Sequence, residues 1–134
     1  MSRGPKLQNA SEELLRQIHP SFIVAGRPSS QAFRPTKKDE GQLSVSMGSK
    51  TSPAQAFELH TGAKGLDSAG VWSLTVGDCD ALGLSAYEDP VIEPVADPAH
   101  AVVDFAGMTD GQLRKCSQLL ARAAVCQYTA TARE

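Results

Sequence analysis

The sequence has few aromatic residues, no long apolar run and no excess of positive charge, and each absence excludes a class of protein. Only 5% of its residues are aromatic, so the core must consist largely of Leu, Val and Ala around a few large side chains. No stretch reaches the roughly 18 apolar residues that a membrane-spanning helix needs. The polar N-terminus also lacks the pattern of a signal peptide. We therefore expect a soluble protein that does not bind a membrane.

Cysteine is scarce as well. The chain has three cysteines and no CxxC pair, which argues against a disulfide framework and against a structural zinc site. Free thiols favour the reducing cytoplasm as the location. Asp78 precedes Cys79 and should raise the pKa of that thiol, which argues against a catalytic cysteine. The net charge of −2 does not suit a general nucleic-acid binder, because such binding requires concentrated Lys and Arg.

The common catalytic and nucleotide-binding motifs are also missing. We find no GxGxxG, no GxxxxGK[ST] and no GxSxG, so a Rossmann turn, a P-loop and a serine nucleophile elbow are excluded. The histidines are about forty residues apart without HxH or HExxH, so no metal site is expected. The sequence indicates no particular cofactor, and it does not decide whether the protein is an enzyme.

A chain of 134 residues fits one compact domain, which we place at residues 11–127. Residues 1–10 are expected to form a flexible lead and residues 128–134 a frayed tail. The pattern predicts an α+β fold, with a small mixed or antiparallel sheet of three to five strands packed against three to four helices.

Three helices are expected. The first follows Ser11, with Leu14, Leu15 and Ile18 as its apolar stripe. The second has Ser52 as its N-cap and Pro53 at the first helical position, and it should end at Gly62. A short turn is expected after Asp78. The last helix opens with a capping box at residues 109–112 and runs to about residue 126.

Three strands are expected, at residues 43–47, 71–76 and 99–105. The first alternates Leu, Val and Met with serine, and the second is apolar enough to be buried on both faces. The segment from Glu88 to Asp97 carries four acids and is interpreted as a solvated loop.

The segment from His19 to Gly48 is too polar for the core and is stiffened by three prolines, so we interpret it as the functional surface. It contains an ordered loop that Phe33 should attach to the core. Arg27 and Arg34 flank Ser29 and Ser30, and guanidinium groups with serine hydroxyls are typical ligands of phosphate or carboxylate.

Two histidines stand near prolines at element ends, namely His19 and His100. An imidazole can both accept and donate a proton in catalysis, so they are the candidate catalytic residues, although histidines at such positions often have only structural roles. We predict that the loop 26–44 and His100 form a cleft for a nucleotide or other phosphate-bearing ligand. Arg27, Ser29, Ser30, Arg34 and Ser44 are the candidate ligand-binding residues.

The order of elements loosely resembles that of ADP-ribosyltransferase-like domains over about half the chain. His19, Ser44 in the LSVS strand and Ala56 would be the corresponding residues. The resemblance implies a cleft for NAD. Pro20 departs from the usual first motif of that family, and no late catalytic glutamate is found.

Two hypotheses follow from these patterns. The first is a ligand-binding protein, with hydrolysis or group transfer as the reaction to test if it is an enzyme. The second is a non-enzymatic accessory or immunity-type protein, which would bind a protein partner through the ordered loop and the acidic segment. The two hypotheses differ in whether His19, Arg34 and His100 share one concavity.

Overall fold

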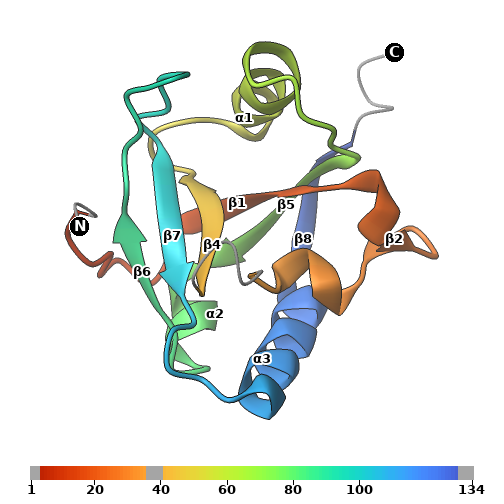
Figure 1. The fold of residues 1–134 in the computed structure, drawn as a ribbon, viewed down its shortest axis with the longest axis vertical. Coiled ribbons are helices and arrows are strands. Elements are labelled where there is room, and N and C mark those ends of the chain that lie inside the picture. Colours follow the sequence, from red (N-terminus) through yellow and green to blue (C-terminus); the bar gives the residue numbers. More distant parts are fainter. Residues whose placement is uncertain (1–3, 36–40, 130–134) are drawn as a thin grey trace.

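A computed structural model describes residues 4–35 and 41–129. The chain folds around a six-stranded antiparallel sheet with the order β6-β7-β4-β1-β5-β8, and β2 and β3 form a separate hairpin (Figure 1). The strands are β1 (Glu13–Ile18), β2 (Ile23–Val24), β3 (Arg27–Pro28), β4 (Gln42–Met47), β5 (Gly70–Thr75), β6 (Ser85–Glu88), β7 (His100–Asp104) and β8 (Val125–Thr129).

The α-helices are α1 (Pro53–Glu58), α2 (Val76–Asp80) and α3 (Asp110–Ala123). Helix α1 continues into a π-helical turn, η4 (Leu59–Ala63), and two short 3₁₀ helices lie at η1 (Pro20–Phe22) and η2 (Ser30–Phe33). None of the helices described is both long and apolar enough to span a membrane.

The predicted fold class is wrong. The sheet has six strands rather than three to five, a second sheet of two strands accompanies it, and the helices are few and short. The domain is therefore dominated by its sheet. The prediction failed because two strands of the six-stranded sheet were missed and a third was interpreted as a helix.

The predicted first helix is strand β1, at the centre of the sheet. It pairs with β4 on one side and with β5 on the other, so both of its edges are hydrogen-bonded within the sheet. Leu14 and Leu15 point to opposite faces, and their exposed fractions are 0% and 1%. A strand buried on both faces shows no period of two, which is why its apolar residues resembled a helical stripe.

Of the other predicted strands, β4, β5 and β7 are confirmed to within one or two residues. The missed strands, β6 and β8, lie at the two edges of the sheet. Strand β8 has three exposed residues in succession, Val125 to Gln127, so it carries no alternation that could be recognised. The last helix consequently ends at Ala123, and Cys126 belongs to a strand.

Helix N-termini were predicted better than C-termini. Ser52 accepts a hydrogen bond from the Gln55 backbone N–H, and Thr109 forms the predicted capping box with Gln112. The chain continues as η4 through Gly62, so the predicted end of the second helix is wrong. Thr75, rather than Asp78, is the N-cap of α2.

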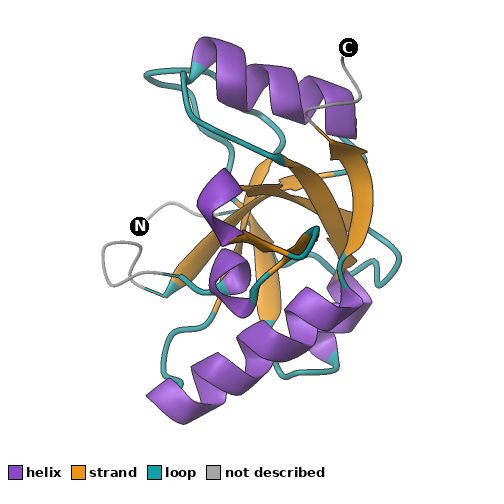
Figure 2. Ribbon diagram, turned by 90° about the vertical axis from the view of Figure 1, so that its right-hand side faces the viewer, coloured by secondary structure: helices purple, strands orange, loops and turns teal. Residues whose placement is uncertain are grey.

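The alternation along β1 and β5 builds two cores on opposite faces of the sheet (Figure 2). Leu14, Ile18 and Leu74 belong to the larger core, which α3 covers. Leu15 and Val71 belong to the smaller core, together with Phe57 of α1. Helices α1 and α3 thus protect opposite faces of one sheet.

Phe33 attaches the predicted loop to the larger core, as expected, and its exposed fraction is 0%. The loop is not irregular throughout, because η2 packs against α3 and the Ser117 hydroxyl donates to the Phe33 carbonyl at 3.2 Å. Residues 36–40 of this loop lie outside the described residues.

The two chain ends predicted to be flexible are described only in part. Residues 4–7 run along the outer edge of β6, where the Leu7 N–H donates to the Ala86 carbonyl at 2.8 Å. Tyr128 belongs to β8 and packs against Phe57 with ring centroids 5.0 Å apart. Residues 1–3 and 130–134 lie outside the described residues.

We expect Gly70→Ala to lower the free energy of unfolding by about 2 to 4 kcal/mol. Gly70 has φ +154, and a Cβ there would overlap the carbonyl oxygen of Tyr128. Gly62→Ala is the matched control, since nothing lies within 4 Å of its Cβ position. Urea denaturation of both variants measures the difference, and equal stabilities would contradict this account of the β5–β8 contact.

Candidate functional site

A cavity of about 440 Å³ lies where β1 and β4 separate. These strands pair at only two positions, Leu14 with Met47 and Leu15 with Ser46, although each strand has six residues. Beyond Leu15 the strands diverge, and their side chains line the opening together with the π-helical turn and the segment that leads into β7. The polar lining residues are Arg16, Gln17, His19, Ser44, Ser46, His60, Lys64, Asp67, Asp97 and His100.

The register of the sheet brings part of this lining together. Ser46 on β4 pairs with Leu15 on β1 and with His100 on β7, so the three residues form a row across adjacent strands. Residues opposite each other in neighbouring strands point to the same face. His100 therefore lies on the face of the sheet that α1 covers.

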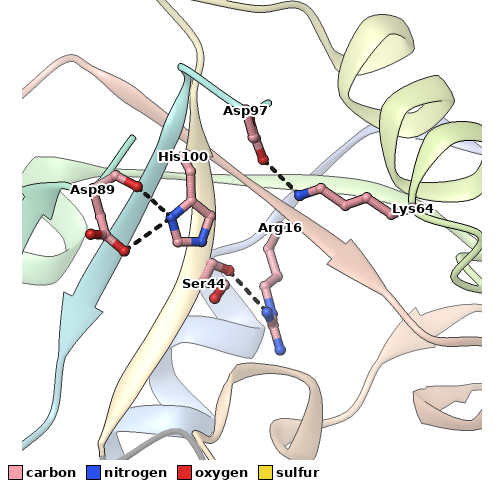
Figure 3. A network of polar contacts seen from close by, with 6 residues as sticks. All are labelled: Arg16, Ser44, Lys64, Asp89, Asp97 and His100. Carbon is pink, nitrogen blue, oxygen red and sulfur yellow. Dashed lines mark hydrogen bonds and ion pairs between the residues drawn. The ribbon is translucent and has the colours of Figure 1, made fainter. Parts of the chain in front are cut away.

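Arg16 bridges the gap between the diverging strands. Its Nε donates to the carbonyl of Ala32 in η2 at 2.9 Å. Its Nη1 donates to the carbonyl of Ser44 in β4, also at 2.9 Å (Figure 3). The guanidinium thus hydrogen-bonds a β4 carbonyl beyond the point where β1 and β4 cease to pair. These bonds fix a positive charge at the cavity.

His100 is held by Asp89, which follows β6. Its Nδ1 lies 2.8 Å from the Asp89 carbonyl oxygen and 3.2 Å from Asp89 Oδ2 (Figure 3). The side chain is 15% exposed. A histidine held by one ring nitrogen presents the other to its surroundings in a fixed direction.

Lys64 and Asp97 form a buried ion pair at the wall of the cavity. Lys64 Nζ donates to Asp97 Oδ2 at 2.7 Å, and the Asp97 side chain is only 5% exposed (Figure 3). The segment from Glu88 to Asp97 is therefore not a solvated acidic loop as predicted. Glu88 is bonded to Lys50 and Asp89 to His100, so three of its four acids have cationic or imidazole partners within the protein.

His19 and His60 both contact Asp67. His60 Nε2 lies 3.3 Å from the Asp67 carbonyl oxygen, and His19 Nε2 lies 3.9 Å from Asp67 Oδ2. Burial lowers the pKa of His60, and the positive charges of Lys64 and Arg16 lower it further, while the Asp67 carbonyl opposes the shift. His60 is therefore neutral at pH 7.

The charges of the lining nearly cancel, but they are not distributed evenly. Asp97 is neutralised by Lys64, and the Asp67 side chain is 81% exposed, so water screens its charge. Arg16 is more enclosed, and its charge contributes to the lowered pKa of His60. The cavity thus contains the guanidinium of Arg16 together with neutral donors and acceptors.

The structure brings together only some of the residues predicted from the sequence. His19, Ser44 and His100 line the cavity. Arg34 lines a second cavity, of about 620 Å³, next to the start of α3. The expectation that His19, Arg34 and His100 share one concavity is therefore wrong for Arg34.

Arg27, Ser29 and Ser30 line neither cavity. Arg27 Nη2 approaches the Ala121 carbonyl of α3 at 3.4 Å, and the Ser29 N–H donates to the Phe22 carbonyl at 2.8 Å. The predicted loop folds onto α3 because Phe33 is buried there, and this turns the segment away from His100. A cleft between the 26–44 loop and His100 is not what the described residues form.

Among the lining residues that the prediction missed are Arg16, His60, Lys64 and Asp97. Arg16 was placed on a helix, and no local signal marks the other three. Ala56, singled out by the family resemblance, is buried beside Phe57 in the smaller core and does not line the cavity.

Within residues 4–35 and 41–129 there is no group of three or more His, Cys, Asp or Glu side chains placed to hold a metal ion. Comparison of the chain with protein-family models, with curated proteins and with solved structures found no match.

The ion pair at the cavity wall should be important for stability. We expect Lys64→Met to lower the free energy of unfolding by about 3 kcal/mol, because Asp97 would remain buried without its cation. Lys50→Met is the matched control: Lys50 donates to Glu88 at 2.9 Å but is 43% exposed, so the loss should stay below about 1 kcal/mol. Chemical denaturation measures the free energy of unfolding of both variants. A larger loss for Lys50→Met than for Lys64→Met would contradict this expectation.

Cysteine reactivity should follow burial. Burial, with the neighbouring charges of Asp78 and Asp80, raises the pKa of Cys79 to about 12. Its thiol is therefore protonated at pH 8, and Cys116 is also buried. We expect iodoacetamide to modify only the exposed Cys126 in the folded protein and all three cysteines in guanidinium, as measured by mass spectrometry. Rapid modification of Cys79 in the folded protein would contradict this.

Proposed function

We propose that the protein binds a small anionic ligand, a nucleotide or another phosphate-bearing molecule, in the cavity between β1 and β4. One observation supports this most directly. All three histidines of the chain line one cavity with Arg16 and Lys64, although these residues come from three separate parts of the sequence. Imidazole, guanidinium and ammonium groups are the side chains that bind phosphate.

The size of the cavity agrees with such a ligand. Its volume of about 440 Å³ falls within the range of small-molecule sites. The main-chain amides and hydroxyls of β4 are close by, since Ser44 and Ser46 lie along its floor. Hydrolysis or group transfer on the bound phosphate is the class of reaction that histidines at such a site would serve.

Binding of a protein partner is the second candidate. Ile92 is 81% exposed in the segment between β6 and β7, and exposed apolar residues of this size are common at interfaces. Three of the four acidic residues in this segment have partners within the protein, so charge gives little support to a basic partner. The cavity is therefore the better supported site.

We expect inorganic phosphate and ribonucleoside 5′-monophosphates to raise the melting temperature of the protein. A ligand at a hundred times its Kd stabilises by about 2.7 kcal/mol. Arg16→Gln should weaken binding by about tenfold, because a charge-assisted hydrogen bond contributes more than about 1 kcal/mol to the free energy of binding. Arg34→Gln is the matched control, since Arg34 lines the second cavity.

The pH dependence provides a second test of the same site. Anion binding favours the protonated form of a histidine that it contacts, so an anion whose charge is constant between pH 5.5 and pH 8, such as sulfate, should bind more tightly at pH 5.5. His60 should contribute least, because burial lowers its pKa. Loss of binding in Arg34→Gln, or no stabilisation by any of these anions, would refute the proposal.

A further inference from the structure

The hydrogen bonds of His100 determine which of its ring nitrogens carries the proton. Nδ1 faces the Asp89 carbonyl oxygen at 2.8 Å and Asp89 Oδ2 at 3.2 Å. A carbonyl oxygen and a carboxylate both accept hydrogen bonds, so Nδ1 must be the donor. In the neutral ring Nε2 is then unprotonated and can only accept. Figure 3 shows this nitrogen turned away from Asp89, to the side where Ser44 and Arg16 lie.

His19 has the opposite arrangement. Its Nδ1 accepts the backbone N–H of Ser21 at 3.1 Å, since Ser21 follows the histidine into η1. Nδ1 is therefore unprotonated, and in the neutral ring the proton resides on Nε2. Nε2 points toward Asp67 Oδ2, which lies 3.9 Å away. One cavity thus contains a histidine acceptor and a histidine donor.

A phosphate group alone does not match this arrangement. Phosphate oxygens accept hydrogen bonds, so they can bind Arg16, Lys64 and the Nε2–H of His19. They cannot donate a hydrogen bond to the unprotonated Nε2 of His100. His100 lines the cavity, where water can donate to this nitrogen in the unliganded protein. A ligand that displaces the water without replacing its hydrogen bond loses affinity. A ligand that supplies a hydrogen-bond donor at this point is therefore favoured.

A hydroxyl group is the donor that suits the surroundings. An ammonium group donates hydrogen bonds but cannot accept one. A hydroxyl also accepts, and Ser46 lies directly opposite His100 in the register of β4 and β7. The hydroxyl of Ser46 is thus placed to donate to the same oxygen that donates to His100.

We propose that the cavity selects a phosphate that also carries a hydroxyl group, such as a sugar phosphate or ribonucleotide, with the hydroxyl donating to Nε2 of His100. This inference rests on the proposed function and names the ligand class. His100 is its specificity-determining residue, and Asp89 is the positioning residue that sets the tautomer.

The tautomers are tested without any ligand. Long-range ¹H–¹⁵N NMR at pH 8.5, above the ordinary titration range of imidazole, identifies the protonated nitrogen of each ring. We expect the Nδ1–H form for His100 and the Nε2–H form for His19. An Nε2–H form for His100 would overturn the proposal.

Selectivity is tested by calorimetry at pH 8 with two pairs of probes. Glycerol 3-phosphate is compared with propyl phosphate, and AMP with 2′,3′-dideoxy-AMP, so that only hydroxyl groups differ within a pair. The hydroxylated member should bind about tenfold more tightly in at least one pair. In His100→Leu the two members of each pair should bind alike.

The outcomes separate the two proposals. Equal binding within both pairs would overturn the hydroxyl selectivity and leave phosphate binding standing. Failure of every probe to bind, inorganic phosphate included, would refute the proposed function itself. If His100→Leu does not fold, the comparison within each pair on the unaltered protein still decides whether the cavity selects hydroxylated phosphates.

Discussion

The early divergence of β1 from β4 is the constraint on which the rest of the structure depends. A central pair of strands that separates after two residue pairs leaves backbone carbonyls without a neighbouring strand, and buried carbonyls need donors. Arg16 supplies such a donor to the Ser44 carbonyl, and its second bond, to Ala32, ties η2 to the same point. The interaction that stabilises the open sheet is therefore also the one that places a positive charge at the cavity.

The same constraint explains how much of the fold the sequence could predict. Local chemistry predicted what is local: the Ser52 and Thr109 caps, the alternation of β4, the apolar β5 and the burial of Phe33. It failed at β1, because a strand covered on both faces shows no period, and at the edge strand β8, where exposed residues follow one another. Both failures depend on sheet neighbours that are distant in the sequence.

The candidate site was predicted in part for a related reason. His19 and His100 were recognised from their own chemistry, and both line the cavity. The arginines of the proline-stiffened loop were assigned wrongly, because Phe33 draws that loop onto α3 and away from β7. Arg16 could be recognised only once β1 is known to be a strand, since only the pairing pattern shows where β1 and β4 part. Residue type thus identified candidates, and topology decided which of them meet.

The cavity combines rigidity with several possible protonation states. A buried carboxylate holds Lys64, Asp89 holds His100, and two backbone carbonyls hold Arg16. These three side chains are therefore oriented before any ligand binds. Pre-oriented groups lose little conformational entropy on binding, which favours affinity for a matching ligand. The histidines differ in how they are held, because Asp89 accepts from one ring and Ser21 donates to another. Identical side chains therefore present different hydrogen-bonding groups, and an asymmetric ligand with both an anionic and a donor group satisfies more of them than a symmetric anion.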